Sequence, residues 1–364
     1  MALSWIIAGG GTGGHVTPAL ALGEVIAARG ESLLFIGSDQ GLEARLVPEA
    51  GFELLTLPSQ QVMGRSLIGK LSGAFRILAQ VGRAQAALRE RNADVVVSVG
   101  GFAAMPAALA ALLTRRPLVL VEPNAIPGRV NRLTARFARR VFMGFDSAAR
   151  HLPRSGKLKP VGIPLRRNLT EAFAKGETRP APRSPLRLLI FGGSQGAHQI
   201  NEAMIAMASE LAECPIQIFH QTGQDDLSAV REAYEKAGVT AEVVAFERDM
   251  PSRYLWADLA ISRAGALTVA ELAMAGLPAL LIPYPFAADD HQAANAEALS
   301  EAGAALRIES RPLDPQRLMQ EVRTLQANPE QLITMSQAAT TRARPDAAEQ
   351  IVEETAAAVQ EHTA

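Results

Sequence analysis

The stretch that decides the fold is Trp5-Ile6-Ile7-Ala8-Gly9-Gly10-Gly11-Thr12-Gly13-Gly14-His15, an apolar run that ends in a glycine-rich loop. The apolar run predicts a buried strand, and the Ala/Leu-rich sequence after it predicts a helix. Glycines at such a turn let the backbone approach a ligand closely, and the N–H groups of the following helix N-terminus attract phosphate. The stretch therefore predicts an α/β fold with an anion site at its first turn.

The second half of the chain repeats this arrangement. An apolar run at residues 186–191 is followed by Gly192-Gly193-Ser194-Gln195-Gly196-Ala197-His198. Both loops contain paired glycines, a hydroxyl residue, a further glycine and a histidine. The simplest account is two similar doubly wound domains, and ligands bind at the carboxyl ends of the strands in such folds. Two domains that face each other would place a cleft between their loops.

Short apolar runs alternate with helical stretches along the whole chain, which predicts parallel sheets built from right-handed βαβ units. The expected strands are residues 5–8, 32–36, 95–99, 118–121 and 140–143 in the first half, and 186–191, 216–221, 241–245, 259–262, 279–282 and 304–308 in the second. We expect a first Rossmann-like domain over residues 1–163 and a second over 164–342. A helix over residues 343–364 is expected to pack back on the first domain. The Pro/basic-rich residues 179–185 are expected to form a surface loop.

Composition excludes several classes of protein. With 364 residues, 48% hydrophobic and 20% charged, the chain is not disordered. Cys214 is the only cysteine, which excludes an internal disulfide and a Cys-based structural zinc site, and fits a reducing cytoplasm. Residues 95–114 are uncharged and long enough to span a membrane, but Gly100-Gly101 and Pro106 favour a strand, a turn and a helix. We predict no signal peptide and no transmembrane helix.

Charge is divided unevenly between the halves. Residues 1–165 carry a net charge of +9 and residues 166–364 a net charge of −10. The first half is therefore expected to meet something anionic, with nucleic acid, anionic lipid and a phosphorylated substrate as candidates. Residues 63–92 hold six Lys/Arg and one acid, with Leu67, Leu71, Phe75 and Leu78 at helical spacing and Lys70, Arg76 and Arg83 beside them. Such a stripe suits an anionic membrane surface, although it could also face the core. A second basic run comprises Arg129, Arg132, Arg136, Arg139 and Arg140.

The most informative segment is Ser262-Arg263-Ala264-Gly265-Ala266-Leu267-Thr268-Val269-Ala270-Glu271. It reads as a strand end, a glycine and a helix that begins near Ala266, whose N-terminus can bind a diphosphate. Glu271 lies one to two turns into this helix, where a carboxylate can accept hydrogen bonds from a ribose diol; alternatively, it is a solvated helix residue. Asp289-Asp290-His291-Gln292 and Asn295 follow the next strand and are candidates for sugar hydroxyls.

These motifs, together with Gly100–Pro106 and Val161-Gly162-Ile163-Pro164-Leu165-Arg166, resemble the family 28 glycosyltransferases of GT-B fold over essentially the whole chain. The resemblance implies two Rossmann-like domains across a cleft. It also implies transfer of N-acetylglucosamine from UDP-N-acetylglucosamine to undecaprenyl-diphospho-N-acetylmuramoyl-pentapeptide (lipid I), giving lipid II for peptidoglycan. Matched by position, the donor-site residues are Thr12, Gly13, Gly14, Asn124, Arg166, Ser194, Glu247, Ala264, Gly265, Ala266, Leu267, Thr268, Val269, Glu271 and Gln292.

The resemblance further implies a single inverting displacement at the anomeric carbon, which needs a base for the acceptor hydroxyl. His15 is the first candidate because an imidazole titrates near neutral pH, and Glu122 is the alternative. His15 could instead only orient the loop or a phosphate. Where the family often has His-Glu-Gln-Asn, this chain reads Val121-Glu122-Pro123-Asn124, so no role of that first His applies here.

Cofactors and partners follow from the same reading. We expect no cofactor and no obligatory metal, because the sequence lacks a D-x-D pair. The expected partners are UDP-N-acetylglucosamine, lipid I, an anionic membrane surface and other cell-wall synthesis proteins, but not nucleic acid. The resemblance implies a peripheral protein on the cytoplasmic face of the cell membrane.

Three other functions remain open on the residues. A UDP-N-acetylglucosamine 2-epimerase would share the fold and need no lipid. An NAD-dependent oxidoreductase would use the G-x-G-x-x-G at Gly9, Gly11 and Gly14. However, the second strand ends in Gly37-Ser38 without the acid that a dinucleotide site needs. A membrane-binding protein without enzymatic activity would leave the segment around Glu271 unexplained.

Overall fold

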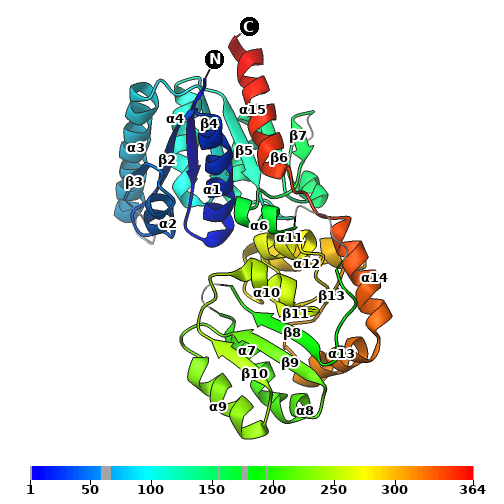
Figure 1. Ribbon diagram of the computed structural model, residues 1–364. Coiled ribbons are helices and arrows are strands. Elements are labelled where there is room, and N and C mark those ends of the chain that lie inside the picture. Colours follow the sequence, from blue (N-terminus) through cyan, green and yellow to red (C-terminus); the bar gives the residue numbers. More distant parts are fainter. Residues whose placement is uncertain (1, 59–66, 154–155, 174–178, 194–195, 364) are drawn as a thin grey trace. The chain divides into compact units, whose positions relative to one another are not determined.

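The chain folds into two compact α/β units (Figure 1). The computed structural model describes residues 2–58, 67–153, 156–173, 179–193 and 196–363, and for residues 67–77 and 363 the backbone alone. Unit 1 comprises residues 1–167 together with 345–364, and unit 2 comprises residues 168–344. The expected boundaries were 163/164 and 342/343. The C-terminal helix α15 (Ala347–Thr363) belongs to unit 1, where it packs against α1 (Gly13–Ala28).

Unit 1 is built on a seven-stranded parallel sheet with the order β3-β2-β1-β4-β5-β6-β7. The strands are β1 (Ser4–Gly9), β2 (Ser32–Ser38), β3 (Leu54–Leu57), β4 (Val95–Gly100), β5 (Leu118–Glu122), β6 (Arg140–Met143) and β7 (Leu158–Pro160). The other helices are α2 (Glu43–Glu49), α3 (Leu67–Glu90), α4 (Met105–Leu113) and α5 (Arg129–Thr134), with short 3₁₀ turns η1 (Phe102–Ala104), η2 (Ala135–Phe137) and η3 (Asp146–His151).

Period-two alternation along β1 fills a core on each face of this sheet. Ile6 and Ala8 join a buried cluster with residues of α3 and α4. Trp5 and Ile7 join another cluster with residues of α1 and α15. Successive side chains of a strand point to opposite faces, so one apolar run can anchor both layers of helices. The uncharged residues 95–114 form β4, η1 and α4, as predicted.

Unit 2 is a six-stranded parallel sheet with the order β10-β9-β8-β11-β12-β13. Its strands are β8 (Leu186–Phe191), β9 (Ile216–Gln221), β10 (Ala241–Val244), β11 (Leu259–Ser262), β12 (Ala279–Leu281) and β13 (Ala305–Arg307). Its helices are α7 (His198–Ala206), α8 (Ala208–Ala212), α9 (Leu227–Ala237), α10 (Met250–Trp256), α11 (Ala266–Met274), α12 (His291–Ser300), α13 (Pro315–Ala327) and α14 (Pro329–Thr340), with the turn η4 (Ala288–Asp290). Helix α6 (Arg167–Phe173) lies at the junction of the units in the sequence.

The two sheets have equivalent strand orders, and this confirms the prediction of two doubly wound units. In unit 1 the strand order reverses between β1 and β4, and in unit 2 between β8 and β11. Ligands of doubly wound folds bind outside the carboxyl ends of the strands at this switch point. A ligand is therefore expected at the glycine loops after β1 and β8 and at the segments after β4 and β11.

The residues 179–185 differ from the expectation in one respect. Most of this segment is exposed, but Arg179 is half-buried. Its guanidinium donates to the carbonyl oxygens of Tyr254, Ala257 and Ala275, and burial lowers its pKa to about 10. A cation that is partly buried loses water, and here carbonyl oxygens replace that water. These hydrogen bonds attach the loop to the rest of unit 2.

Candidate functional site

The switch point of unit 1 brings two glycine loops together. Gly101, after β4, has a φ of +78°, and a Cβ there would overlap the carbonyl oxygen of Gly10. Only glycine allows this approach, since any side chain would push the loops apart. His15, from the first turn of α1, lies over Gly100: a Cβ on Gly100 would stand 3.2 Å from the imidazole Cδ2. The imidazole Nδ1 is 3.2 Å from the hydroxyl oxygen of Thr12.

Helix α1 begins directly behind this loop. Thr12 is its N-cap residue, with extended φ/ψ, and no described side chain caps the first turn. Gly13 and Gly14 occupy its first two positions and are partly exposed. The N–H groups of a helix's first turn have no partner within the helix and point outward along its axis. Residues 12–15 therefore combine N–H donors, a hydroxyl and an imidazole at one turn.

Glu122, at the end of β5, is buried, with 1% of its surface exposed. Its carboxylate accepts hydrogen bonds from the backbone N–H groups of Asn124 (2.9 Å) and Gly128 (2.9 Å), and from the side-chain amide of Asn131 (2.9 Å). Burial raises the pKa of Glu122, although these hydrogen bonds act in the opposite direction. Its oxygens are occupied by the loop that follows β5, which argues against Glu122 as the base for an acceptor hydroxyl.

Asn131 of α5 connects this loop to the others, and sequence reasoning missed it. Its amide nitrogen also donates to the carbonyl of Val121 at 3.1 Å. A Cβ on Gly100 would stand 3.3 Å from the same nitrogen, so Asn131 and His15 both lie against Gly100. Asn131 is 1% exposed, so its role is to hold the β5 loop against the β4 loop. A polar residue among the apolar positions of a short helix was the available signal.

Arg166 lies away from these contacts in the sequence and pairs with α1. Its guanidinium is 3.3 Å from the carboxylate of Glu24, which also accepts from the backbone N–H of Arg167 at 3.1 Å. The side chain is about half exposed. Arg166 therefore fastens the end of unit 1 to α1, and its guanidinium remains accessible to an anionic ligand.

In unit 2 the glycine loop after β8 rests on the end of β9. Ser194 and Gln195 lie outside the described residues. Gly196 has a φ of +78°, and a Cβ there would overlap the carbonyl oxygen of Thr222. The buried amide of Asn201 in α7 donates to that same carbonyl at 2.9 Å and to Asp226 at 2.7 Å. The loop is thus held from behind by a polar network that the sequence did not predict.

The network continues in both directions from Asn201. Its side-chain oxygen is 3.0 Å from Nε2 of His220, which is fully buried and whose pKa burial lowers to about 3. Asp226 binds Nδ1 of the exposed His198 at 2.9 Å, and this hydrogen bond raises the pKa of His198. His220 is therefore a neutral core residue that orients Asn201, whereas the exposed His198 holds a proton more firmly than an ordinary imidazole because its pKa is raised.

The segment after β11 places a helix N-terminus at the second switch point. Gly265 is the N-cap residue of α11, with a φ of −61°, and no described side chain caps the first turn. Ala264 and Ala266 are buried, whereas Leu267 and Thr268 are partly exposed and Val269 is buried. The buried amide of Asn295 in α12 donates to the carbonyl of Ala264 at 3.2 Å and fixes this turn. Free N–H groups at such an N-terminus suit a diphosphate.

Arg263 fastens the neighbouring segments to this turn. Its guanidinium donates to the side-chain oxygen of Gln199 in α7 (3.1 Å) and to the carbonyls of Ile282 and Pro283 after β12. It also lies 5.5 Å from the ring centre of Tyr284. Burial lowers the pKa of Arg263 to about 10, so it stays a cation at neutral pH. This cation ties together the loops after β11 and β12 and the start of α7.

Glu271, in the second turn of α11, has a partner that the sequence did not reveal. The hydroxyl of the buried Tyr254 in α10 donates to Oε2 of Glu271 at 2.7 Å. Burial raises the pKa of Glu271 to about 7, although the Tyr254 hydrogen bond favours the ionised form. Glu271 is thus not the fully solvated helix residue of the alternative reading. Tyr254 fixes one carboxylate oxygen, and the other is the acceptor that could meet a ligand hydroxyl.

Two further sequence-predicted residues bind the backbone of unit 2. Glu247 accepts from the backbone N–H groups of Arg248 (2.7 Å) and Asp249 (2.9 Å) and from Arg253 (2.7 Å). Burial opposes ionisation of Glu247, but these hydrogen bonds outweigh it and lower the pKa. Gln292 in α12 accepts from the N–H of Tyr284 at 2.9 Å, which leaves its amide NH₂ as the group that a ligand could meet.

The residues expected to read sugar hydroxyls are partly used in the fold itself. Asp290 pairs with Arg311 at 3.0 Å, and Asn295 is buried on Ala264. Asp289 and Asp290 both have positive φ, at 51° and 56°. Two such non-glycine residues in succession store strain, which proteins retain at functional sites more than elsewhere.

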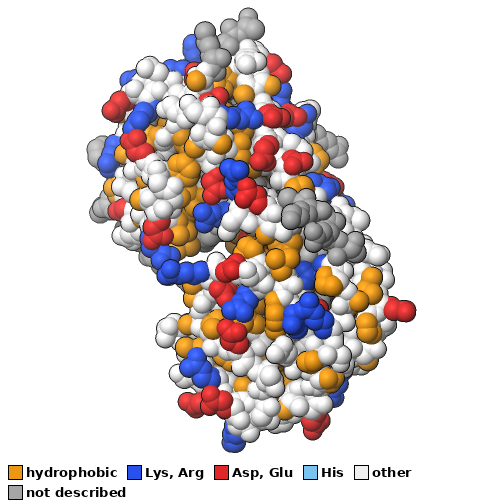
Figure 2. All heavy atoms as spheres, viewed as in Figure 1, with side chains coloured by type: hydrophobic (Ala, Val, Ile, Leu, Met, Phe, Trp, Pro, Cys, Tyr) orange, Lys and Arg blue, Asp and Glu red, His pale blue; other side chains and the backbone are white. Residues whose placement is uncertain are grey.

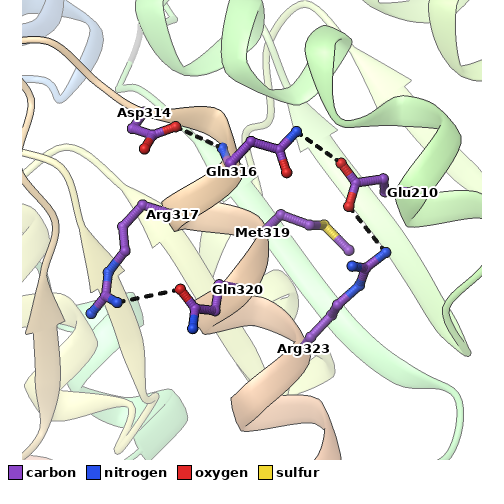
Figure 3. Close-up of a pocket in the computed structure, with 7 residues that line it drawn as sticks. All are labelled: Glu210, Asp314, Gln316, Arg317, Met319, Gln320 and Arg323. Atoms are coloured by element: carbon purple, nitrogen blue, oxygen red, sulfur yellow. Dashed lines mark hydrogen bonds and ion pairs between the residues drawn. The ribbon is translucent and has the colours of Figure 1, made fainter.

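Metal-ligating clusters and pockets add no further candidate site among the described residues. Among the described residues, no three His, Cys, Asp or Glu side chains gather in a way that could hold a metal ion. A pocket of about 380 Å³ lies between α8 and α13, and no residue of the glycine loops lines it (Figure 3). Its polar groups bind one another: Glu210 pairs with Arg323 at 3.0 Å and accepts from Gln316 at 3.0 Å. The pocket therefore offers little unsatisfied polarity to a ligand.

Comparisons with known proteins agree with this arrangement. The model of the glycosyltransferase family 28 N-terminal domain matches residues 5–143, and that of the C-terminal domain matches residues 187–351. A UDP-N-acetylglucosamine--N-acetylmuramyl-(pentapeptide) pyrophosphoryl-undecaprenol N-acetylglucosamine transferase from Alkalilimnicola ehrlichii is 43% identical, covering 96% of this chain and 97% of its own.

Solved structures give the same result. The crystal structure of MurG from Acinetobacter baumannii is 32% identical and superposes with a TM-score of 0.81, covering 96% of this chain and 98% of its own. A UDP-N-acetylglucosamine 2-epimerase from Neisseria meningitidis, solved with UDP-N-acetylglucosamine, has a TM-score of 0.68 at 15% identity, covering 97% of this chain and 99% of its own. That second likeness is one of fold alone.

Proposed function

The chain belongs to glycosyltransferase family 28 and is a hexosyltransferase, and from this premise we propose that it moves N-acetylglucosamine from UDP-N-acetylglucosamine to undecaprenyl-diphospho-N-acetylmuramoyl-pentapeptide. The product is lipid II, the lipid-linked disaccharide for peptidoglycan. The relatives that carry this activity in their names match the chain at 40–44% identity over nearly its full length. The epimerase reading is weaker, because its likeness is limited to the fold.

One observation of the structure carries the donor part of this proposal. The uncapped N-terminus of α11 lies at the switch point of unit 2, and Glu271 follows in the next turn of the same helix. The N–H groups of the first turn suit the UDP diphosphate, whose negative charge grows as the glycosidic bond breaks. One turn further along, the Glu271 carboxylate suits the ribose hydroxyls. One helix thus offers a group for the diphosphate and, one turn further along, a group for the ribose.

The acceptor part of the proposal rests on His15. In the reaction the acceptor oxygen forms a bond to the anomeric carbon, the bond from that carbon to the UDP oxygen breaks, and UDP leaves with the electron pair. The acceptor proton passes to Nε2 of His15 if Nδ1 carries the other proton and donates it to Thr12. In that tautomer the Thr12 hydroxyl accepts the hydrogen bond from Nδ1–H and helps to orient the imidazole ring. We propose no metal in this step: the α11 N-terminus supplies the electrostatic stabilisation.

Membrane attachment is proposed for unit 1. Its net charge is +6, from 21 Lys/Arg and 15 Asp/Glu, whereas unit 2 carries −7. Large apolar side chains of unit 1 are exposed to solvent: Leu78 (67%), Phe102 (80%), Leu113 (66%), Leu133 (57%) and Phe137 (58%). Apolar side chains among cations suit the interface of an anionic membrane. We propose that unit 1 docks peripherally on the cytoplasmic face of the cell membrane, where a lipid-linked acceptor lies.

Two parts of the sequence-based membrane hypothesis need refinement. The structure does not describe the side chains of Leu67, Lys70, Leu71, Phe75 and Arg76. Further along α3, the side chains of Val81, Ala84 and Leu88 are buried in the core. In the second basic run, Arg139 binds His362, and Arg140 binds Glu361 at 3.0 Å. These two arginines hold α15 and are not available to lipid.

Figure 2 shows acidic and basic side chains close together on one face of unit 1. Arg29, directly after α1, pairs with Glu353 of α15 at 3.3 Å. Surface ion pairs of this kind contribute little stability individually, but they neutralise the cations involved. No helix in the described part of the chain is long and apolar enough to cross a membrane. The exposed apolar side chains of unit 1 are the attachment route that we propose.

The deciding experiment measures UDP release from UDP-N-acetylglucosamine with and without lipid I in mixed micelles. We expect release to depend on lipid I and to be accompanied by lipid II. A 2-epimerase would instead convert the sugar nucleotide without any lipid, and an oxidoreductase would require NAD. Lipid-independent epimerisation, or no turnover with lipid I in a folded, UDP-binding protein, would contradict the proposal.

A further inference from the structure

A buried carboxylate lies behind the first glycine loop. Glu43 is the first residue of α2, and 1% of its surface is exposed. Its Oε2 accepts from the backbone N–H of Gly11 at 2.8 Å. Its Oε1 accepts from the backbone N–H and the hydroxyl of Ser38, each at 2.8 Å. The carboxylate thus joins the end of β2 to the loop that follows β1.

Three glycines make room for this carboxylate. A Cβ on Gly10, Gly37 or Gly41 would overlap atoms of the Glu43 side chain. The glycines come from three different segments: the loop after β1, strand β2 and the turn before α2. Their common feature is contact with Glu43, so part of the glycine content of this region serves the carboxylate and not a ligand. Ser38 completes the enclosure, since its hydroxyl accepts from the N–H of Gly41 at 2.9 Å.

This arrangement changes what the first loop can bind. The N–H of Gly11 is already occupied by a carboxylate oxygen, so it is not a donor for phosphate. The charge of Glu43 also makes the back of the loop unfavourable for an anion. The groups left to face a substrate are those that follow Gly11, from Thr12 to His15. A charge-assisted hydrogen bond from an N–H group to a buried carboxylate is stronger than a neutral one, and this bond fixes the loop at Gly11, the residue before Thr12.

We propose that Glu43 is a positioning residue: its hydrogen bond to the Gly11 N–H sets the place of Thr12 and His15 for the transfer step. This inference rests on the proposed function for its effect on turnover, but the effect on the loop does not. Glu43 acts through Gly11 and does not touch the substrate. Its loss should therefore lower kcat and leave the UDP site of unit 2 unchanged. The Glu43 side chain also binds Ser38 at the end of β2. In a dinucleotide-binding fold, an acid at this strand end would bind the ribose instead.

Glu43→Gln is the main variant because it keeps the shape of the side chain. A glutamine has one acceptor oxygen, and Ser38 presents two donors where Gly11 presents one. We therefore expect the oxygen to face Ser38 and the NH₂ to face the Gly11 N–H, so the hydrogen bond to Gly11 is lost. Glu43→Asp is a second variant that keeps the charge but shortens the reach. Glu49→Gln is the matched control: it removes a carboxylate from the same helix at a site that is 60% exposed.

The first measurement is hydrogen–deuterium exchange of the peptide that contains Gly11. We expect exchange about tenfold or more faster in Glu43→Gln, and unchanged in Glu49→Gln. Ser38→Ala is a further control, because it removes a hydrogen bond to Glu43 but keeps the bond to Gly11, and protection of the loop should persist. Wild-type protection in both folded Glu43 variants would overturn the proposal, whatever reaction the protein catalyses.

The second measurement is steady-state transfer to lipid I together with UDP binding by calorimetry. We expect kcat to fall about 10- to 100-fold in Glu43→Gln, because misplacing a reacting group by about 1 Å has an effect of this size. The affinity for UDP should stay within about twofold of wild type. Equal kcat in Glu43→Gln and Glu49→Gln would overturn the positioning role. Absence of lipid I transfer in wild type would instead contradict the proposed function, and the exchange result would still decide whether Glu43 holds the loop.

Discussion

Three buried or half-buried glutamates near the strand ends have different roles because their surroundings differ. Glu43 and Glu122 are almost completely occupied by backbone N–H donors and serve to hold loops. Glu271 has a tyrosine hydroxyl on one oxygen and retains a second oxygen for a ligand. Burial raises the pKa of Glu122, but hydrogen bonds from neighbouring residues already occupy its carboxylate oxygens, which leaves little room for an acceptor hydroxyl to bind there. On this reasoning, Glu122 is a positioning residue and His15 is the stronger candidate for the base.

The half-buried Glu271 should give UDP binding a pH dependence. Its pKa in the folded protein is about 7, above the value near 4.5 of an exposed carboxyl, so it ionises between pH 6 and 8. The ionised form is the better hydrogen-bond acceptor, and hydrogen bonds to charged groups contribute about 1.5–3 kcal/mol. We expect Glu271→Gln to weaken UDP binding more at pH 8.5 than at pH 6, measured by calorimetry. The ionisation of UDP itself cancels in the comparison of the two proteins.

The same group fixes the sign of a stability effect. Because the folded pKa is raised, the Glu271 contribution to stability is fully present below about pH 4.5 and is lost as the pH rises through 7. Glu271→Gln should therefore gain stability relative to wild type on going from pH 5 to pH 8.5, by roughly 1–3 kcal/mol in urea unfolding. A constant difference between the two proteins across this range would show that Glu271 does not titrate there.

His15 and Thr12 should act as a pair in turnover. His15→Ala is expected to lower kcat by roughly 10²–10⁴-fold with UDP affinity unchanged, which is the usual effect of losing a general base. Thr12→Val keeps the branched shape but removes the hydroxyl that contacts Nδ1 of His15 and orients its ring, so we expect a smaller loss of about 10-fold. If His15 only orients a phosphate, His15→Ala should instead weaken substrate binding and leave kcat near that of wild type.

At the scale of elements, the long buried strands were predicted, and so were the short edge strands β10 and β13 of unit 2, whereas the two edge strands of unit 1 were not. The expected strand at residues 186–191 is β8 without change, since strands buried on both faces form continuous apolar runs. Strands β3 (Leu54–Leu57) and β7 (Leu158–Pro160) were missed. Both are short, lie at the two edges of the sheet and are only partly buried, so their apolar signal is weak.

The candidate site shows the same limit in another form. The glycine loops and the α11 segment could be predicted because each is contiguous in the sequence. Their supporting residues could not: Glu43 lies 32 residues from Gly11, and Tyr254 lies 17 residues from Glu271. Such pairs are brought together only by the strand order. Sequence patterns therefore identify the groups that meet a ligand better than those that hold these groups in place.

The N-terminus of α11 offers a test at the scale of one element. Gly265 has a φ of −61°, and a Cβ there would meet its nearest atom, the Thr268 hydroxyl oxygen, at 3.6 Å. Gly265→Ala should therefore fold, with stability equal to wild type or raised by about 0.4–1 kcal/mol. If the diphosphate binds at this N-terminus, the added methyl group should reduce UDP affinity about tenfold or more in calorimetry.

Gly276, at the other end of the helix, is the contrasting position. It has a φ of +58°, and a Cβ there would stand 2.8 Å from the Thr340 side chain. Gly276→Ala should lower the melting temperature without affecting the UDP affinity of the protein that remains folded. A Gly265→Ala variant that binds UDP as well as wild type does would move the diphosphate away from α11.

For the whole molecule, the equivalent strand orders mean that both units place a glycine loop at the same point of the fold. Each unit has its switch point beside the first strand, and in each a polar network fixes the glycine loop from behind: Glu43 in unit 1, and Asn201 with Asp226 in unit 2. The units differ in charge, with +6 against −7. Shared architecture therefore explains the ligand loops, while the surface charge and the exposed apolar side chains distinguish the unit that we propose to meet the membrane.

The membrane proposal can be tested on the intact protein with side chains whose loss should not unfold it. Leu113, Leu133 and Phe137 of unit 1 are each more than half exposed, so changing all three to Ser should leave the melting temperature nearly unchanged. Each side chain that enters the apolar layer contributes up to roughly 1.5–3 kcal/mol. We expect the triple variant to bind anionic vesicles at least tenfold more weakly in a sedimentation assay, and wild-type binding to weaken with added salt because screening reduces the attraction of unit 1 to the lipid.

The matched control changes exposed apolar side chains of unit 2. Leu255 and Ile333 are 54% and 37% exposed, and their unit carries a net charge of −7, so Leu255→Ser with Ile333→Ser should bind vesicles as wild type does. A general effect of surface polarity would weaken binding in both sets of variants, whereas a docking surface on unit 1 would weaken it only in the first. Transfer to a short-chain, water-soluble analogue of lipid I should be unaffected in either set, because the loops after β1 and β11 are unchanged. A folded triple variant of unit 1 with wild-type vesicle binding would leave these three side chains without a role in attachment.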